Sequence, residues 1–304
     1  MKKFLNSIPL TISSMALSFA TLGNILSSME TVKPLFGSIA FLLVIIVFLK
    51  MIFTNDQFKK DMSNPVIAST FVTLSMCIVV LSTYVKPVSN ILGMILWFAG
   101  LLSHIIIIIY VLKKFIMPSR KIIPSYYVTF VGIAVAAVTS AAFNLKSLGF
   151  VIDIVAFICF IILTIPILKN LFKKDYIPTP ANPTKVIVAA PLSLVIVGYI
   201  NSASSVNLTL LQLCLIIAFI LTIIGIYFLV TTLKKSFNPA YAAYTFPITI
   251  SSFAMKAASA AIGDGAVGKI SHNIYNVEII LAVFITVLIL ILNIVNCITN
   301  TRKK

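Results

Sequence analysis

The sequence predicts an all-α polytopic membrane protein with a single transmembrane domain over residues 1–304. The first observation is composition: 60% of the residues are hydrophobic and 10% are charged, whereas soluble domains are about 25% charged. The second is a mean hydropathy of +1.13. The third is a series of apolar runs, each near the roughly 20 residues with which a helix crosses the hydrocarbon. Because backbone groups cannot stay unpaired in lipid, these runs must be helices.

Ten such runs follow one another along the chain. They lie at about 9–28, 35–54, 65–85, 89–112, 124–143, 147–168, 185–201, 208–233, 241–260 and 277–299. The first run has the basic start of a signal peptide, but it is long, rich in hydroxyls and followed by further runs, so we expect it to be retained. The four cysteines lie inside apolar runs without a C-x-x-C pair, so we expect no cofactor and no metal site.

The basic residues indicate how these helices are oriented. Of the 23 Lys and Arg residues, 18 lie at the N-terminus, at the connections after even-numbered runs, or at the C-terminus. They include Lys234, Lys235 and the final "TRKK". Lys256 lies within a run, and the opposite connections carry the other four: Lys33, Lys86, Lys146 and Lys269. This positive-inside bias predicts that both termini are cytoplasmic, which requires an even number of spans.

The net charge of +16 is therefore explained by topology and by anionic lipid headgroups. We expect the lipid bilayer as a partner and no nucleic acid. The short connections and scarce acids suit a multi-pass protein of a bacterial plasma membrane.

A proline recurs in every odd-numbered run. Pro9, Pro65, Pro124, Pro191 and Pro247 are spaced 56, 59, 67 and 56 residues apart, which is about one helical hairpin. A period of this size marks repeated units, here five hairpins at approximately 1–56, 57–114, 115–174, 175–236 and 237–304. The odd runs also contain Ser, Thr, Gly and Ala, whereas the even runs are uniformly apolar.

This difference predicts an inner and an outer ring in a quasi-fivefold arrangement. Small and hydroxyl-bearing residues belong where helices pack closely or meet water, and uniformly apolar helices belong against lipid. Five odd helices kinked by their prolines would then enclose a central pore. The alternative is that proline at a helix start is ordinary N1 chemistry, and that the hydroxyls serve packing alone.

Three stretches resemble a known family. "YTFPIT" in the ninth run, "PSYYVTFVG" in the fifth and "APLSLVIVGY" in the seventh are similar to helices of the tellurite-resistance/C4-dicarboxylate transporter family, which includes a bacterial tellurite-resistance anion channel homologue and the plant slow anion channel. The resemblance implies a quasi-fivefold hairpin barrel, a homotrimer with one pore per subunit, and a phenylalanine that occludes the pore. By motif that residue is Phe246. The chain lacks tryptophans before "YTFP" and lacks long regulatory tails, so regulation of the plant type is not implied.

The ninth run supports a gate at this position. Phe246 and Phe253 lie seven residues apart, about 20° from one helical face, with Ile250 between them and Ser252 beside them. A ring at the kink would plug the pore, because hydrophobic constrictions close by dewetting. Six residues after their prolines the other odd runs carry Met15, Phe71, Phe130 and Val197. These predict an apolar girdle bordered by hydroxyls, the alternative being packing between helices. The bordering residues are Ser13, Ser14, Ser69, Thr70, Thr129 and Ser252.

A few ionisable residues lie inside or beside apolar runs. Lys256 would attract anions at the outer mouth or extend to the interface. Asp153 and His104 are possible proton sites, with packing and hydrogen bonding as the alternative for both. Glu278, beside the last connection, is interpreted as a helix-start residue.

The sequence therefore predicts a channel for small inorganic or organic anions. Acidic rings, which a cation pathway needs, are missing. The first alternative is a proton-coupled transporter of C4-dicarboxylates, sulfite or tellurite-like oxyanions. An intramembrane enzyme is the weakest alternative, because no run contains a carboxylate pair or a metal motif and the pair Ser252 and Lys256 has no accompanying oxyanion site.

Overall fold

The computed structural model describes residues 2–233 and 237–302, and every regular element in these residues is a helix. The predicted basic residues Lys234, Lys235, Lys303 and Lys304 lie outside the described residues. The long apolar helices are α3 (Val32–Phe53), α7 (Asn90–Val111), α11 (Lys146–Leu171), α13 (Leu208–Thr232) and α15 (Ala266–Arg302).

The hydroxyl-rich segments are shorter and more often interrupted. They are α2 (Ile12–Ile25); α5 (Pro65–Phe71) with α6 (Thr73–Val85); α9 (Tyr126–Phe130) with η2 (Gly132–Ala134), α10 (Val135–Ser140) and η3 (Ala141–Phe143); η4 (Thr179–Ala189) with α12 (Pro191–Ser202); and η5 (Pro239–Tyr244) with α14 (Thr245–Ile262). The short helix α1 (Lys2–Ser7) precedes α2, and the short helices α4 (Asn55–Asp61), η1 (Leu112–Ile116) and α8 (Met117–Ser119) lie in connections between longer ones.

The five repeated prolines do not all act as the sequence predicts. Pro65 is the first residue of α5, where Asn64 caps the helix by accepting bonds from the backbone N–H groups of Val66 and Ile67. Pro9 and Pro124 lie before α2 and α9. None of these three kinks a helix, because each stands at the first residue of a helix or before it, where a proline removes no helical hydrogen bond. Pro191 and Pro247 do stand inside longer segments, close to where a 3₁₀ helix passes into an α-helix.

Among the described residues, seven helical segments are long and apolar enough to cross a membrane. They are Val32–Phe53, Pro65–Val85, Asn90–Ser119, Lys146–Leu171, Thr179–Ser202, Leu208–Thr232 and Ala266–Thr299. The segments Ile12–Ile25 and Gly132–Phe143 are apolar but shorter, and α14 has 18 residues. The protein is thus an all-α membrane protein, and the predicted runs that do not reach spanning length and hydropathy are all hydroxyl-rich ones.

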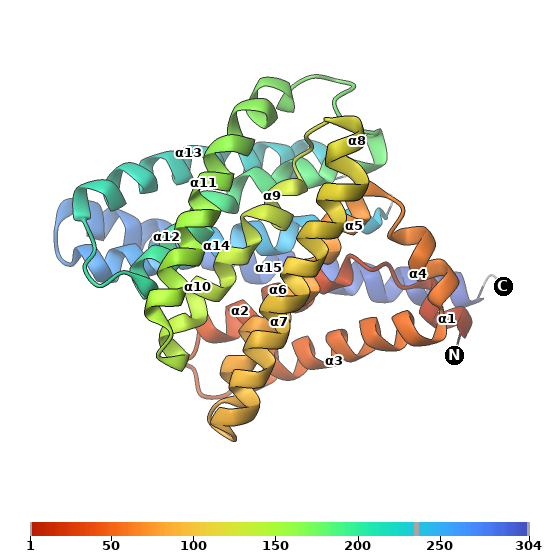
Figure 1. Ribbon diagram of the computed structural model, residues 1–304, viewed down its shortest axis with the longest axis horizontal. Coiled ribbons are helices and arrows are strands. Elements are labelled where there is room, and N and C mark those ends of the chain that lie inside the picture. Colours follow the sequence, from red (N-terminus) through yellow and green to blue (C-terminus); the bar gives the residue numbers. More distant parts are fainter. Residues whose placement is uncertain (1, 234–236, 303–304) are drawn as a thin grey trace.

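The hydroxyl-rich helices contact one another in a closed series. α2 contacts α6, α6 contacts α10, α10 contacts α12, α12 contacts α14, and α14 returns to α2. The long apolar helices pack outside this series, each against two successive members: α3 on α2 and α6, α11 on α10 and α12, α13 on α12 and α14, and α15 on α14 and α2. α7 packs on α6 and on the segment formed by α9 and η2 (Figure 1).

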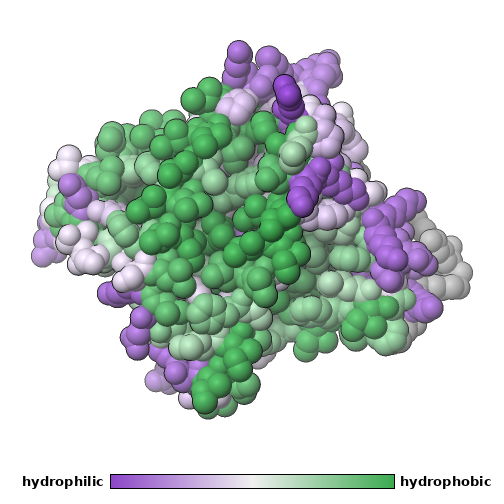
Figure 2. Space-filling model, viewed as in Figure 1, coloured by the Kyte–Doolittle hydropathy of each residue, from purple (hydrophilic) through white to green (hydrophobic). Residues whose placement is uncertain are grey.

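The outer helices leave their apolar side chains exposed. Large hydrophobic residues are exposed along all of them, among them Leu42, Ile106, Ile162, Ile216 and Ile291. Figure 2 shows a broad hydrophobic face over α7 and α11, with hydrophilic residues gathered toward the ends of the molecule. An apolar area of this extent is a surface for lipid. The first helix, α1, packs against α15, the last (Figure 1).

Candidate functional site

Two adjoining cavities lie among the hydroxyl-rich segments. The larger, here called the vestibule, has a volume of about 660 Å³ and is lined by the beginnings of these segments, including Pro9, Pro65, Ile123, Pro180 and Pro239. The smaller, here called the inner chamber, has a volume of about 30 Å³. Ser14, Thr70 and Ala243 line both cavities, so the vestibule leads directly to the inner chamber.

All the hydroxyl-rich segments contribute to the inner chamber. Ser14 comes from α2, and Thr70, Thr73 and Met76 come from α5 and α6. The third segment contributes Tyr127, Val128, Val131 and Gly132, the fourth Ile187, Ala190, Pro191 and Leu194, and the fifth Ala243, Phe246 and Pro247. The chamber therefore lies on the axis around which the segments close.

Phe246 is the second residue of α14, and its side chain is 5% exposed. The backbone before it is held by Thr245, whose hydroxyl donates to the Ala242 carbonyl at 2.9 Å and lies 3.3 Å from the Ser14 carbonyl. Pro247 has no N–H to offer the carbonyl of Ala243, and Ala243 stands at the junction of the two cavities. The local sequence thus places an aromatic ring at a break in backbone hydrogen bonding.

The inner chamber offers few polar groups to a ligand. The hydroxyl of Thr70 donates to the Val66 carbonyl at 2.8 Å, and that of Thr73 donates to the Thr70 carbonyl at 2.8 Å. Ser14 donates to the Thr73 hydroxyl at 3.3 Å. A volume of about 30 Å³ has room for only a few water molecules. The chamber is therefore too small for a hydrated ion.

The predicted girdle residues do not line either cavity. Met15 faces α15, where its sulfur accepts from Asn293 at 3.7 Å. Phe71 packs edge-on against Phe58 of α4, with ring centroids 5.5 Å apart, and Phe130 packs against Tyr126. Val197 is fully buried in α12.

The girdle was predicted six residues after each proline. In α2 and α5 the residues five after the proline, Ser14 and Thr70, line the chamber. One further residue turns a side chain by about 100°, so Met15 and Phe71 face neighbouring helices.

Most of the predicted hydroxyls lie between helices. Ser13 bonds to Thr73 at 2.7 Å, and Thr129 donates to the Ser69 carbonyl at 3.1 Å. Ser252 donates to the Thr249 carbonyl within α14. Of the stripe predicted on α14, Ile250 and Phe253 line neither cavity. The structure thus brings Ser14, Thr70 and Phe246 together and distributes the others through the helix packing.

The predicted ionisable residues also lie away from the two cavities. Asp153 of α11 is 4% exposed, faces Gly198 of α12, and its Oδ1 has no hydrogen-bond partner in the described part of the chain. His104 of α7 contacts the Thr129 carbonyl through Nε2 at 3.0 Å. Lys256 donates to the carbonyl of Ile25, the last residue of α2, and lies over the ring of Tyr275. A cation at a helix C-terminus offsets the negative end of the helix dipole.

Glu278 differs from its sequence interpretation as a helix-start residue. α15 begins at Ala266, so Glu278 lies well inside it and is 4% exposed. Its Oε2 has no hydrogen-bond partner within residues 2–233 and 237–302. The apolar pattern begins only near residue 277, and it could not show that the helix starts a full three turns earlier.

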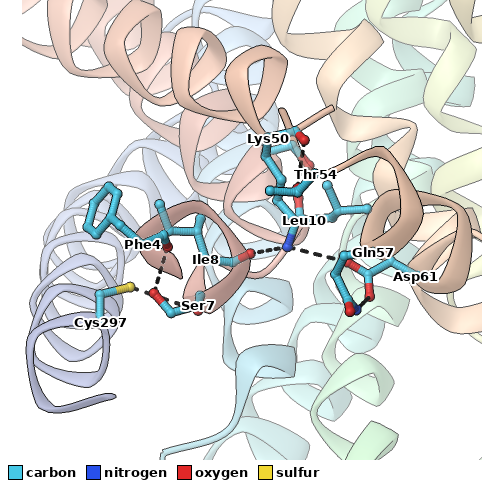
Figure 3. Close-up of polar contacts among 10 residues, drawn as sticks. Phe4, Ser7, Ile8, Leu10, Lys50, Thr54, Gln57, Asp61 and Cys297 are labelled. Carbon is cyan, nitrogen blue, oxygen red and sulfur yellow. Dashed lines mark hydrogen bonds and ion pairs between the residues drawn. The ribbon is translucent and has the colours of Figure 1, made fainter. Parts of the chain in front are cut away.

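An ion pair between a buried lysine and a partly exposed aspartate in the vestibule wall escaped the sequence interpretation. Lys50, at the end of α3, is 2% exposed; it donates to the carbonyl of Ile8 and lies 3.4 Å from Oδ2 of Asp61 in α4 (Figure 3). Gln57 donates to the other carboxylate oxygen of Asp61 at 2.7 Å. Lys50, Gln57 and Asp61 all line the vestibule. The only signal in the sequence is a lysine at the end of an otherwise apolar run.

Comparison with known proteins gives one family. The family model described as "SLAC1: Voltage-dependent anion channel" matches residues 7–300. No curated protein sequence matches the chain significantly. The matched region includes every residue that lines the inner chamber.

Proposed function

Because the chain belongs to the SLAC1 voltage-dependent anion channel family, we propose that small anions cross the membrane along the axis through the vestibule and the inner chamber. Members of this family are membrane anion channels or transporters and not enzymes. In this proposal ten membrane segments form five hairpins, the hydroxyl-rich members surround the pore, and the apolar members face lipid. The closed series of contacts from α2 through α14 supports it. A segment screened from lipid by an outer helix has no need of the hydropathy that a lipid-facing span requires.

Phe246 is proposed as the gate of this pore. Its ring borders a chamber of about 30 Å³ on the axis, and the surrounding hydroxyl protons are already donated to backbone or to one another. An anion entering the chamber would have to shed its water with little replacement, which makes the chamber a barrier until the ring moves. The position of Phe246 at the narrow cavity is the observation that carries the proposal.

Anion preference follows from the same features. The hydroxyl-rich segments begin at the vestibule, so the positive ends of their dipoles lie there. No arginine lines either cavity among the described residues, so this part of the pathway lacks the bidentate donor that holds carboxylates or phosphates tightly. Selection by dehydration cost favours weakly hydrated monovalent anions.

Recording from planar bilayers tests the gate. Phe246→Ala should raise the anion conductance well above that of the native chain, with a reversal potential that follows the anion gradient. Phe253→Ala is the matched control, because it removes the same kind of ring from the same helix, and Phe253 lines neither cavity. Equal conductances of the two variants would contradict the gate.

We further propose that both termini are cytoplasmic and that three copies associate. The orientation rests on the distribution of basic residues, and the trimer rests on family resemblance alone. Protease protection of a C-terminal tag in sealed cells checks the first proposal. The protein mass of the detergent-solubilised particle checks the second.

A proton-coupled carrier of C4-dicarboxylates, sulfite or tellurite-like oxyanions is the second candidate. The buried carboxylate of Asp153, with an oxygen that lacks a partner in the described chain, favours it. Such a carrier would show a reversal potential that shifts with pH at fixed anion concentration, and Asp153→Asn would abolish this shift. A reversal potential independent of pH would exclude coupling.

A further inference from the structure

We propose that Lys50 and Asp61 form a weak binding site for a small monovalent anion in the vestibule, in which Lys50 holds the anion and Asp61 limits how tightly it is held. This proposal rests on the channel function given above. The ion pair lines the vestibule on the approach to the inner chamber, so an anion bound there would wait at the entrance to the gate.

The ammonium group of Lys50 has a donor to spare. One of its three N–H groups donates to the Ile8 carbonyl and a second is directed to Asp61 Oδ2 at 3.4 Å. Within the described part of the chain, these are the hydrogen bond and the ion pair of Nζ, and Cys297 of α15 also interacts electrostatically with Lys50. Because Lys50 lines the vestibule, the remaining N–H can meet an anion that enters it.

Asp61 is held in place and cannot simply turn toward Lys50 for a closer pair. Gln57 donates to its Oδ1 at 2.7 Å, one helical turn away in α4. The Lys50 backbone is fixed in turn, because the Thr54 hydroxyl donates to the Lys50 carbonyl at 2.7 Å. Figure 3 shows Lys50 between the turn after α1 and α4, with both partners directed at its nitrogen.

Burying a lysine is costly unless its charge is compensated. An apolar residue of similar volume would hold α1, α3 and α4 together as effectively as Lys50 does, because buried ion pairs are often replaceable by hydrophobic residues without loss of stability. The cation instead lies against the cavity that leads to the chamber. Its position therefore favours a role in attracting anions over a purely structural one.

The charge balance of the vestibule explains the role of Asp61. Among the residues that the structure describes, the charged side chains lining the vestibule are Lys50, Lys121 and Asp61, and their charges sum to +1. A channel site must attract its ion yet release it quickly. With its counter-ion 3.4 Å away, Lys50 attracts an anion more weakly than a free ammonium would. The single available donor and the nearby carboxylate favour monovalent anions over dianions.

Conductance measured against anion concentration on the vestibule side tests the site, in a Phe246→Ala background so that the gate does not limit current. Asp61→Asn raises the net charge of the described vestibule lining from +1 to +2. It should raise conductance at low salt roughly threefold, the effect of a unit charge about 6 Å away in water, and conductance should saturate at a lower concentration. The difference should vanish at high salt, where the charge is screened. Asp56→Asn is the matched control, because it removes the same charge from α4 outside the vestibule lining.

Lys50 variants give the opposite test. Lys50→Met should lower conductance at low salt, and Lys50→Arg should keep it. The double variant Lys50→Met/Asp61→Asn leaves neither charge of the pair without its partner. It therefore tests the anion site even if one of the single variants does not fold. The net charge of the described vestibule lining is then again +1, so conductance at low salt should match that of the Phe246→Ala parent. Conductance should saturate at a higher anion concentration, because the anion site has been removed.

The outcomes separate this site from the channel proposal. Absence of current in every variant would remove the channel itself. Two results would overturn the anion site and leave the channel proposal intact. The first is the same dependence of conductance on anion concentration in Asp61→Asn and Asp56→Asn. The second is an unchanged saturation concentration in the double variant.

Discussion

The contact between α11 and α12 allows a quantitative test of the packing. A Cβ added to Gly198 would overlap Asp153 Oδ1 and lie 3.0 Å from its Cγ and 3.1 Å from the Ala137 Cβ, whereas ordinary contact begins near 3.4 Å. The carboxyl is 4% exposed and has little room to retreat. Overpacking of this kind costs about 1–3 kcal/mol. We therefore expect Gly198→Ala to lower the unfolding temperature by roughly 2–5 °C.

Trp97 provides the assay. It is the single tryptophan of the chain and is fully buried between α7 and the neighbouring segment, where its indole donates to Thr139 at 2.8 Å. Its emission should move to longer wavelength as the helices separate. Gly265→Ala is the control, because its added Cβ would meet nothing within 4 Å, and it should change stability by less than about 0.5 kcal/mol.

A double-mutant cycle identifies the cause. In an Asp153→Ala background the space of the carboxylate is vacated, and Gly198→Ala should then cost less than about 0.5 kcal/mol, a coupling of 1 kcal/mol or more. An equal cost of Gly198→Ala in both backgrounds would refute the proposed contact between α11 and α12.

Three other predictions concern separate parts of the molecule. Lys256→Met should lower the free energy of unfolding by about 1 kcal/mol, because the last carbonyl of α2 loses its donor; an unchanged unfolding temperature would show that water replaces it. Thr139→Val should cost about 1–3 kcal/mol by leaving the indole N–H of Trp97 unpaired in a buried site, measured by chemical unfolding with Thr231→Val, an exposed position, as the control. In the Phe246→Ala channel, permeability ratios from reversal potentials should follow ease of dehydration, with nitrate above chloride and dicarboxylates lowest; a preference for dicarboxylates would contradict a pathway without a tight site.

The helices themselves were predictable because their cause is local. Apolar runs of spanning length must satisfy their backbone groups internally, and the even-numbered runs correspond to α3, α7, α11, α13 and α15. The family resemblance was also predictable, since "YTFPIT" and the proline period are present in the sequence, and the family match over residues 7–300 confirms it. The prolines were only partly predictable, because the sequence does not show where each helix begins relative to its proline.

The lining of the chamber was less predictable. Counting from each proline selected Met15 and Phe71, whereas Ser14 and Thr70, one residue earlier in each segment, line the chamber. A rotation by one residue, about 100°, decides whether a side chain meets the axis or a neighbouring helix. That rotation depends on how the helices pack.

The sequence by itself determined that the chain is a bundle of membrane helices with alternating hydroxyl-rich and apolar members, because solvation by lipid acts on each segment separately. Only the tertiary structure decided that Phe246 lies at a narrow chamber, that Glu278 is buried, and that Lys50 meets Asp61 in the vestibule wall. These are relations between segments distant in the chain or between a segment and a cavity. They follow from how the helices rotate and where each one starts, which no single segment specifies.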